Sequence, residues 1–178
     1  MDTDLELILD FVNTLDRRPG LEVLDGPAAL AEWLGGHDLL APGLQVGVSE
    51  VADAQKVREA IRVLLLAHNE VEVDETAALE TLDAAAARAD LCIRFSGGAS
   101  HCESLADGVD GALGRILARV ADAMADGRWE RLKACRADDC QWAFFDGAKN
   151  RSRAWCSMSS CGNRAKMSAF RGRHAVES

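Results

Sequence analysis

Four cysteines in the last quarter of the sequence have the spacing of a metal site. Cys135 and Cys140 are separated by four residues, as are Cys156 and Cys161, and fifteen residues lie between the two pairs. A short turn can bring the two sulfurs of each pair onto one ion, and four thiolates are a closed ligand set of structural zinc. Because this segment is too small for a core of its own, we predict that one structural zinc ion holds it together.

Two other chemistries use paired cysteines, namely a redox dithiol and an iron–sulfur cluster. Redox pairs more often have two intervening residues, whereas both pairs here have four. An iron–sulfur cluster also takes four thiolates and is the main alternative metal centre. Cys92 and Cys102 lie outside the pattern, and we expect them to be ordinary thiols.

Basic and aromatic side chains surround the four cysteines. Thiolates on zinc leave a net negative charge that nearby cations can neutralise, and the candidates are Arg136, Lys149, Arg151, Arg153 and Arg164. Four of the nine aromatic residues should pack this small lobe, namely Trp142, Phe144, Phe145 and Trp155. Gly162 follows the last cysteine, where a backbone N–H pointing at sulfur favours a residue without a side chain.

The charges divide the chain into an acidic part and a basic part. Residues 1–127 contain 9 Lys+Arg and 24 Asp+Glu, a balance of −15, and residues 128–178 contain 11 and 5, a balance of +6. Such an asymmetry suggests different partners for the two parts. The alternative is that the basic residues offset the metal thiolates and dock on the acidic part. We therefore predict a domain at residues 1–127 and a zinc finger at residues 128–178.

The spacing of apolar residues predicts a mostly helical first part, and an α+β fold for the whole chain. The predicted helices cover residues 5–15, 27–34, 49–69, 74–87 and 109–124. Residues 91–95 and 101–105 read as strands on either side of a turn at Ser96-Gly97-Gly98-Ala99, which predicts a β-hairpin lying on the helices. In the finger we expect a short hairpin and then a helix from Ser157 or Ser159 to about Arg173.

The residues around the last cysteines resemble the CGNR zinc-finger family. The matching residues are Trp155-Cys156-Ser157-Met158, Cys161-Gly162-Asn163-Arg164, Lys166, Phe144-Phe145-Asp146, Asn150-Arg151 and the basic tail Arg171-Gly172-Arg173. Gly147-Ala148 departs from the pattern, in which a more polar pair is expected, but it touches no ligand. Residues 9–14 resemble the start of the ABATE domain, which precedes this finger in bacterial proteins. The resemblance implies a bacterial transcription regulator.

A helix after Ser160 would present polar and basic side chains to a nucleic acid. Arg and Asn read base edges in the major groove, and Lys binds phosphates. The predicted DNA-contacting residues are Asn163, Arg164, Lys166, Arg171 and Arg173. A homodimer would double the phosphate contacts of one small finger. The alternative is a structural or protein-docking module whose arginines turn onto the acidic domain.

Three polar residues interrupt the apolar pattern of the first helix. Asp10, Asn13 and Thr14 are candidate ligand-binding residues for a small-molecule effector that would control the finger. The simpler interpretation, which we favour, is that Asp10 and Asn13 hydrogen-bond loop backbone near residues 17–20.

Enzymes and membrane proteins are disfavoured classes. Four cysteines leave zinc no open position for water, and no histidine lies in a catalytic motif, since His37, His68, His101 and His174 are scattered. We therefore expect no enzyme. The longest apolar run, near residues 63–67, is too short to span a membrane, and the acidic N-terminus is unlike a signal peptide. We expect a cytoplasmic protein.

Overall fold

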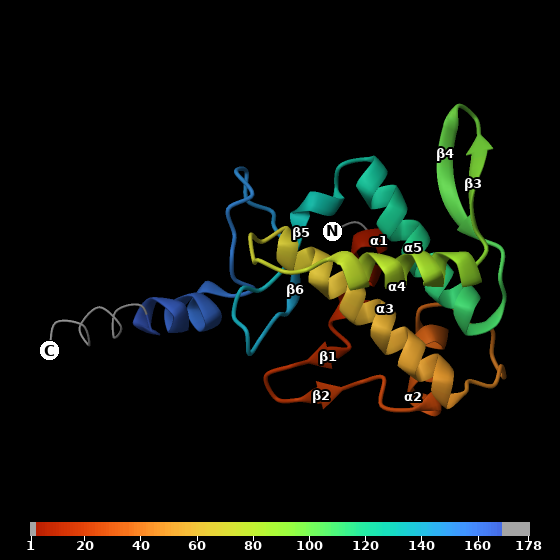
Figure 1. Cartoon of the computed structure of the whole chain (residues 1–178), viewed down its shortest axis with the longest axis horizontal. Coiled ribbons are helices and arrows are strands. Elements are labelled where there is room, and N and C mark those ends of the chain that lie inside the picture. The colour runs from red at the N-terminus through yellow and green to blue at the C-terminus, as the bar shows by residue number, and fades with distance from the viewer. Residues whose placement is uncertain (1–2, 169–178) are drawn as a thin grey trace, which may run out of the picture.

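The amphipathic segments of the first part form helices around one aliphatic core (Figure 1). The computed structural model describes residues 3–168, and its helices before residue 128 are α1 (Thr3–Val12), α2 (Pro27–Gly36), α3 (Val48–Ala67), α4 (Thr76–Arg88) and α5 (Gly108–Ala125). Ile61 and Leu65 of α3 meet Leu113 and Ile116 of α5 in this core, together with Phe11 of α1. Among the described residues, no helix is long and apolar enough to cross a membrane.

The first helix ends earlier than predicted. α1 stops at Val12, and the chain then forms a small hairpin of β1 (Leu15–Asp16) and β2 (Leu21–Glu22) that the sequence did not reveal.

The helix α3 begins one residue before the predicted cap Ser49. The carboxylate of Glu50 accepts a hydrogen bond from the N–H of Gly47 at 2.6 Å, so Gly47 is the N-cap.

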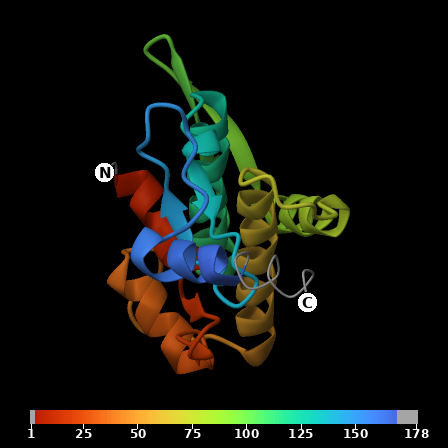
Figure 2. The same ribbon diagram turned by 90° about the vertical axis from the view of Figure 1, so that its left-hand side faces the viewer.

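The predicted central hairpin is confirmed. β3 (Leu91–Ser96) and β4 (Ala99–Ser104) are antiparallel, with Ile93 opposite Cys102. Positive φ angles at Gly97 and Gly98, of 58° and 86°, allow the two-residue turn. β4 lies on α5, but both views show the tip of the hairpin extending beyond the helices (Figures 1 and 2).

The basic part begins with η1 (Trp129–Arg131) and a hairpin of β5 (Leu132–Ala134) and β6 (Ala143–Phe145). Leu132, Ala134 and Ala143 are buried in the same core as the helices, so the aliphatic core continues past residue 128. A π-helical turn, η2 (Met158–Gly162), leads into a helix over 163–168 that points away from the helical core (Figure 1). The predicted continuation of this helix to Arg173 lies outside the described residues.

Candidate metal centre

The four predicted cysteines converge in the structure. Their sulfur atoms all lie within 4.8 Å of one another. Sγ of Cys156 is 3.6 Å from Sγ of Cys140 and 3.7 Å from Sγ of Cys161. A tetrahedral zinc ion with Zn–S bonds of about 2.3 Å separates its sulfur ligands by about 3.8 Å. The cluster therefore fits one zinc ion with four thiolate ligands.

The β5–β6 hairpin positions the first pair of cysteines. Cys135 follows β5, and its N–H donates to the carbonyl of Trp142 at 3.0 Å. Cys140 closes the intervening turn by donating to the carbonyl of Ala137 at 2.8 Å. Gln141 then adopts a φ of 49°, which reverses the chain into β6. The sulfurs of this pair thus come from the two ends of one tight turn.

Close packing explains the glycine after the last cysteine. A β-carbon on Gly162 would lie 2.7 Å from Sδ of Met158 and 3.3 Å from the ring of Trp155. The N–H of Gly162 donates to the carbonyl of Ser157 at 3.0 Å. The predicted reason, an N–H pointing at sulfur, is therefore wrong, and steric contact is the reason.

Most of the cluster is closed to solvent. Three of the cysteines are buried, and the fourth, Cys156, is half-buried. The aromatic side chains that pack around the sulfurs are Trp142, Phe144 and Trp155, whereas Phe145 packs on the helical core. A closed set of four thiolates leaves no position for water or substrate, so the ion would stabilise the fold rather than react.

The cation nearest to the sulfurs comes from the first part of the chain. Arg18, in the β1–β2 turn, donates from Nη2 to Sγ of Cys161 at 2.8 Å and from Nη1 to Oγ of Ser160 at 3.1 Å. Nη2 of Arg164 lies 3.7 Å from the same sulfur. Burial raises the pKa of the Cys161 thiol, but hydrogen bonds from the neighbouring thiols and both guanidiniums outweigh it and lower that pKa to about 7. Both arginines thus favour the thiolate that zinc requires.

Sequence reasoning missed Arg18 and placed other cations here. Among residues 3–168, Arg164 is the one of the five predicted cations whose side chain contacts a sulfur. Three have other partners, which are Glu70 for Arg136, Glu130 for Arg151 and the ring of Phe144 for Arg153. The one available signal for Arg18 was a basic pair, Arg17-Arg18, in a strongly acidic region.

Two family models match the chain in succession. The model described as a CGNR zinc finger matches residues 131–174 and includes all four cysteines. The ABATE model, described as a "putative stress-induced transcription regulator", matches residues 5–127. The chain belongs to the ABATE family. Its ABATE region (residues 5–127) is followed by a CGNR finger (residues 131–174), which confirms the resemblance seen in the sequence. A search of curated proteins finds no match.

The helix after η2 carries the predicted DNA contacts of the CGNR finger. Asn163 and Lys166 are exposed there. Arg164 forms a two-point ion pair with Asp139, with N···O distances of 2.6 and 3.1 Å, so its guanidinium is engaged within the finger. Arg171 and Arg173 lie outside the described residues. The amide of Asn163 makes only a long hydrogen bond within its own helix, to the carbonyl of Ser159 at 3.3 Å, so Asn163 and Lys166 are the described candidates best placed to reach a partner.

The three polar residues predicted as a ligand site do not share one site. Asn13 makes two hydrogen bonds with the backbone of Ala143, donating to its carbonyl at 3.0 Å and accepting from its N–H at 2.8 Å. Thr14 is buried and accepts a hydrogen bond from Arg58 at 3.2 Å, while Asp10 is exposed. The loop contact that we favoured for Asn13 is therefore wrong, because Asn13 joins the ABATE region to β6 of the finger.

Buried polar side chains of α3 and its end add further links to the finger. Arg62 is fully buried and donates to the carbonyl of Gln141 at 2.7 Å. Asn69 donates to the carbonyls of Ala134 and Ala154 at 2.7 and 2.8 Å. Residues 134 and 141 each adjoin one of the cysteines, so these bonds hold the backbone beside the metal ligands. The sequence signal was the placement of charged residues on the apolar side of a helix.

A buried ion pair supports the loop that follows β6. Asp146 is fully buried and accepts hydrogen bonds from Nζ of Lys133 at 2.9 Å and from the N–H groups of Ala148 and Arg153 at 3.0 and 2.9 Å. Burial raises the pKa of the Asp146 carboxyl, but these hydrogen bonds outweigh it and hold that pKa below its ordinary value. The ionised carboxylate thus fixes the start of the loop between β6 and the second cysteine pair.

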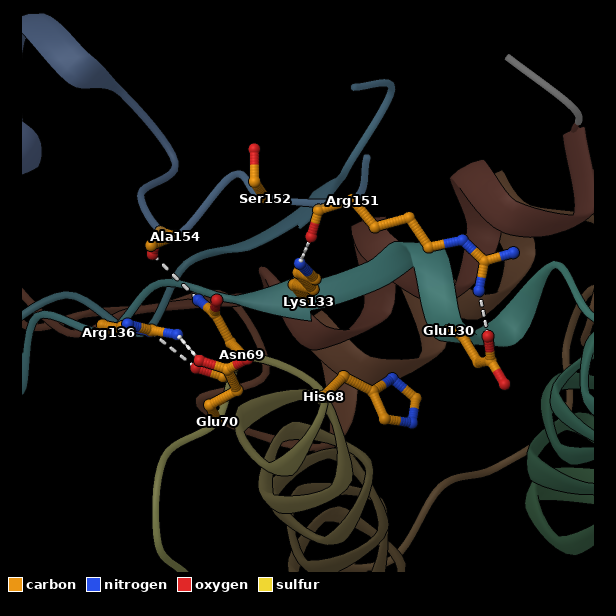
Figure 3. Close-up of a pocket in the computed structure, with 9 residues that line it drawn as sticks. All are labelled: His68, Asn69, Glu70, Glu130, Lys133, Arg136, Arg151, Ser152 and Ala154. Atoms are coloured by element: carbon orange, nitrogen blue, oxygen red, sulfur yellow. Dashed lines mark hydrogen bonds and ion pairs between the residues drawn. The ribbon is translucent and has the colours of Figure 1, made fainter. Parts of the chain in front are cut away.

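A cavity of about 510 Å³ lies between the end of α3 and the CGNR finger (Figure 3). Its charged lining residues already have partners. Arg136 pairs with Glu70 at 2.7 Å, Arg151 pairs with Glu130, and Lys133 is held by the buried carboxylate described above. The cavity therefore presents no uncompensated charge, and we assign no ligand to it.

Proposed function

We propose that the CGNR finger binds DNA and that the chain is a transcription regulator, with the ABATE region as a sensing or dimerisation domain. The observation that carries the proposal is the exposed pair Asn163 and Lys166, on a helix whose preceding turn contains the candidate zinc ligand Cys161. An amide and an ammonium are suited to a base edge and a phosphate, respectively. Such a regulator would act in the cytoplasm.

The charge distribution supports an approach of DNA to this end of the molecule. Residues 128–178 carry a balance of +6, and four thiolates on a divalent zinc ion would lower it by two, to +4. Residues 1–127 carry −15 and would repel a phosphate backbone. The helix over 163–168 points away from this acidic body (Figure 1), so DNA can meet the finger first.

The two sides of this helix are suited to different roles. Arg164 faces Asp139, and the ion pair ties that side to the turn between the first two cysteines. Asn163 and Lys166 are three residues apart and lie on one face of a helix with 3.6 residues per turn. A B-DNA major groove is wide enough to admit a helix presented in this way.

The test is fluorescence anisotropy of the zinc-loaded chain with labelled duplex DNA at several salt concentrations. Lys166→Ala is expected to weaken binding about equally for all sequences and to reduce the salt slope by about one unit. Asn163→Ala is expected to change the preference among sequences. Lys56→Ala, an exposed lysine on α3 that pairs with Asp53, is the matched control and should leave binding unchanged.

The absence of any binding at low salt by the zinc-loaded chain would overturn the proposal. The alternative role would then be a structural or protein-docking module. One observation favours that role, because Arg136 already donates to the backbone of Asn69 at 2.6 Å and to Glu70 at 2.7 Å. An arginine of the finger thus turns onto the ABATE region, as the docking alternative requires.

We also propose that the chain is not an enzyme. A four-cysteine zinc has no open coordination position. The described histidines have separate surroundings. The ring centroids of His37 and Trp33 are 4.2 Å apart, and His68 hydrogen-bonds the carbonyl of Leu132 at 2.9 Å. His101 lies on the exposed hairpin. His174 lies outside the described residues. A hydrolytic activity of the zinc-loaded wild type that is lost in His68→Gln would contradict this view, and no activity in either protein is expected.

A further inference from the structure

The β3–β4 hairpin leaves one strand edge without a partner. Among residues 3–168, β4 is the one strand that pairs with β3. The N–H of Cys102 points away from β3, because it donates to the carboxylate of Asp122 on α5 at 3.0 Å. Along a strand of an antiparallel pair, residues whose backbone N–H and C=O groups point toward the partner strand alternate with residues whose groups point away from it. The backbone groups of Ile93, opposite Cys102, and of Leu91 and Phe95 therefore point outward from β3.

This edge lacks the usual protection of an exposed strand. The part of the chain described here contains no hydrogen-bond partner for the backbone of Ile93 or Phe95. Their side chains are 62% and 84% exposed. Natural edge strands carry a Pro, a Lys or a bulge that blocks further pairing, and β3 has none of these. Its one charged residue, Arg94, pairs with Glu103 of β4 at 2.7 Å.

We propose that β3 pairs antiparallel with β3 of a second copy of this chain. A twofold axis beside Ile93 places that residue opposite Ile93 of the second copy, and Leu91 opposite Phe95. All three residues have outward backbone groups, as hydrogen-bonded antiparallel pairs require. The strand is thus complementary to itself in one register, which joins the exposed side chains of the two Ile93 residues and places each exposed Phe95 against a half-buried Leu91.

The charge distribution favours a second copy over a strongly charged partner. Residues 91–104 contain one Arg and one Glu, which pair with each other, within a region that carries −15 in total. Two acidic bodies that meet at this neutral hairpin avoid the repulsion that another pairing of their surfaces would cause. An acidic or basic partner would find no free charge on the hairpin to recognise.

The geometry around the hairpin permits this assembly. The hairpin extends beyond the helices in both views (Figures 1 and 2), so a second body can reach its edge. Pairing would convert two marginal two-stranded sheets into one four-stranded sheet. The finger lies at the opposite end of the molecule in Figure 1 and would remain open in the dimer. The proposal specifies the dimerisation role suggested above, but it holds whether or not the finger binds DNA.

The first test is sedimentation equilibrium of the zinc-loaded full chain without DNA, over about 1 to 100 μM. The expected result is a dimer whose fraction increases with concentration. A monomer throughout this range would overturn the proposal and would leave the edge to a different protein. Because no DNA is present, failure of this test is distinct from failure of the proposed DNA binding.

A matched pair of variants locates the interface. Ile93→Lys places two like charges opposite each other across the axis and should raise the dimer dissociation constant by at least about tenfold. Leu79→Lys makes the same change at a 48% exposed position on α4 and should leave the dimer intact. Circular dichroism of both variants is the control for correct folding. Equal dimerisation by the two variants would contradict the assigned interface.

Disulfide trapping tests the register. In a Cys92→Ser and Cys102→Ser background, Ile93→Cys places two thiols at the axis, within reach of a disulfide. Mild oxidation should give a covalent dimer with Ile93→Cys and none with Leu79→Cys. The reverse pattern, or no covalent dimer for either variant, would overturn the proposed pairing.

Discussion

The ABATE region and the CGNR finger are stabilised in different ways within one chain. The ABATE region buries aliphatic side chains such as Leu65 and Ile116 between long helices. The finger has a small cluster of aromatic side chains around four thiols, and its strands β5 and β6 rely on the helical core for burial. The finger therefore relies on the ABATE region for burial, and a metal ion on the four thiols would supply the stabilisation that its small cluster lacks.

Polar side chains make the connection between the two regions. Arg18 reaches Cys161 across 143 residues of sequence, and Asn13 reaches the backbone of β6 across 130. Arg62 reaches the turn that follows Cys140 from the middle of α3. Each of these bonds satisfies a buried or half-buried group of the finger, so the ABATE region contributes directly to the backbone around the metal ligands.

Removal of zinc should have the largest effect, and it should destabilise the finger far more than the ABATE region. Structural zinc contributes on the order of 10–16 kcal/mol of binding free energy to small domains at neutral pH. Chelation should therefore remove amide protection from residues 135–168, while α1, α3 and α5 retain theirs, as measured by hydrogen exchange with mass spectrometry. If amide protection were lost uniformly over the whole chain, or fully retained in the finger, the two regions would not be stabilised in different ways.

A cavity in the aliphatic core should affect the ABATE region first. Leu65 is fully buried, and Leu65→Ala should lower the free energy of unfolding by about 2–5 kcal/mol. Leu79→Ala, on the exposed face of α4, should change it by less than about 0.5 kcal/mol. Chemical denaturation of the zinc-loaded chain measures both values. The description of the core would be wrong if the two variants were equally stable.

Loss of one connecting side chain should have an intermediate effect. Asn13→Ala leaves the N–H and carbonyl of Ala143 without their partner and should cost about 1–3 kcal/mol of stability. Asp10→Ala, one turn earlier and exposed, is the control and should be nearly neutral. Equal effects in thermal denaturation would mean that the docking role of Asn13 is incorrect.

A more local effect, confined to the metal ligands, concerns the pH dependence of zinc retention. Arg18 helps to lower the pKa of Cys161, so Arg18→Ala should raise that pKa and let protons displace zinc at a higher pH. Metal affinity should fall about 10- to 100-fold, as measured by competition with a chromophoric chelator between about pH 5 and 7. Arg17→Ala removes a neighbouring cation that pairs with Glu59 instead. A matching shift in this control would contradict a specific role for Arg18.

Local patterns made much of the fold and the metal site predictable. Cysteine spacing identified the ligands because each pair needs only one short turn to reach an ion. The apolar periodicity of α3 and α5 was clear. The predicted turn at residues 96–99 located the central hairpin, and its two glycines adopt the positive φ angles that such a turn requires. These features depend on neighbours in the sequence, or on a metal that joins two local turns.

The remaining features depend on contacts between distant residues. No local pattern places Arg18 beside Cys161, because that contact follows from how the β1–β2 turn packs on the finger. Arg62 is buried among aliphatic side chains because backbone carbonyls and Glu59 satisfy its guanidinium, which the helical periodicity alone does not show. Long-range packing also explains Asn13, which the sequence suggested as a ligand contact and which instead hydrogen-bonds the backbone of Ala143 in the finger.

The most direct test of the account is DNA binding by one preparation before and after zinc removal. Anisotropy with duplex DNA between about 50 and 200 mM salt should show binding that weakens steeply with salt while zinc is present. Chelation should abolish this binding while the ABATE helices stay folded, and added zinc should restore it. Binding that persists without zinc, or that is absent with zinc at low salt, would contradict the claim that the metal centre presents a DNA-binding helix.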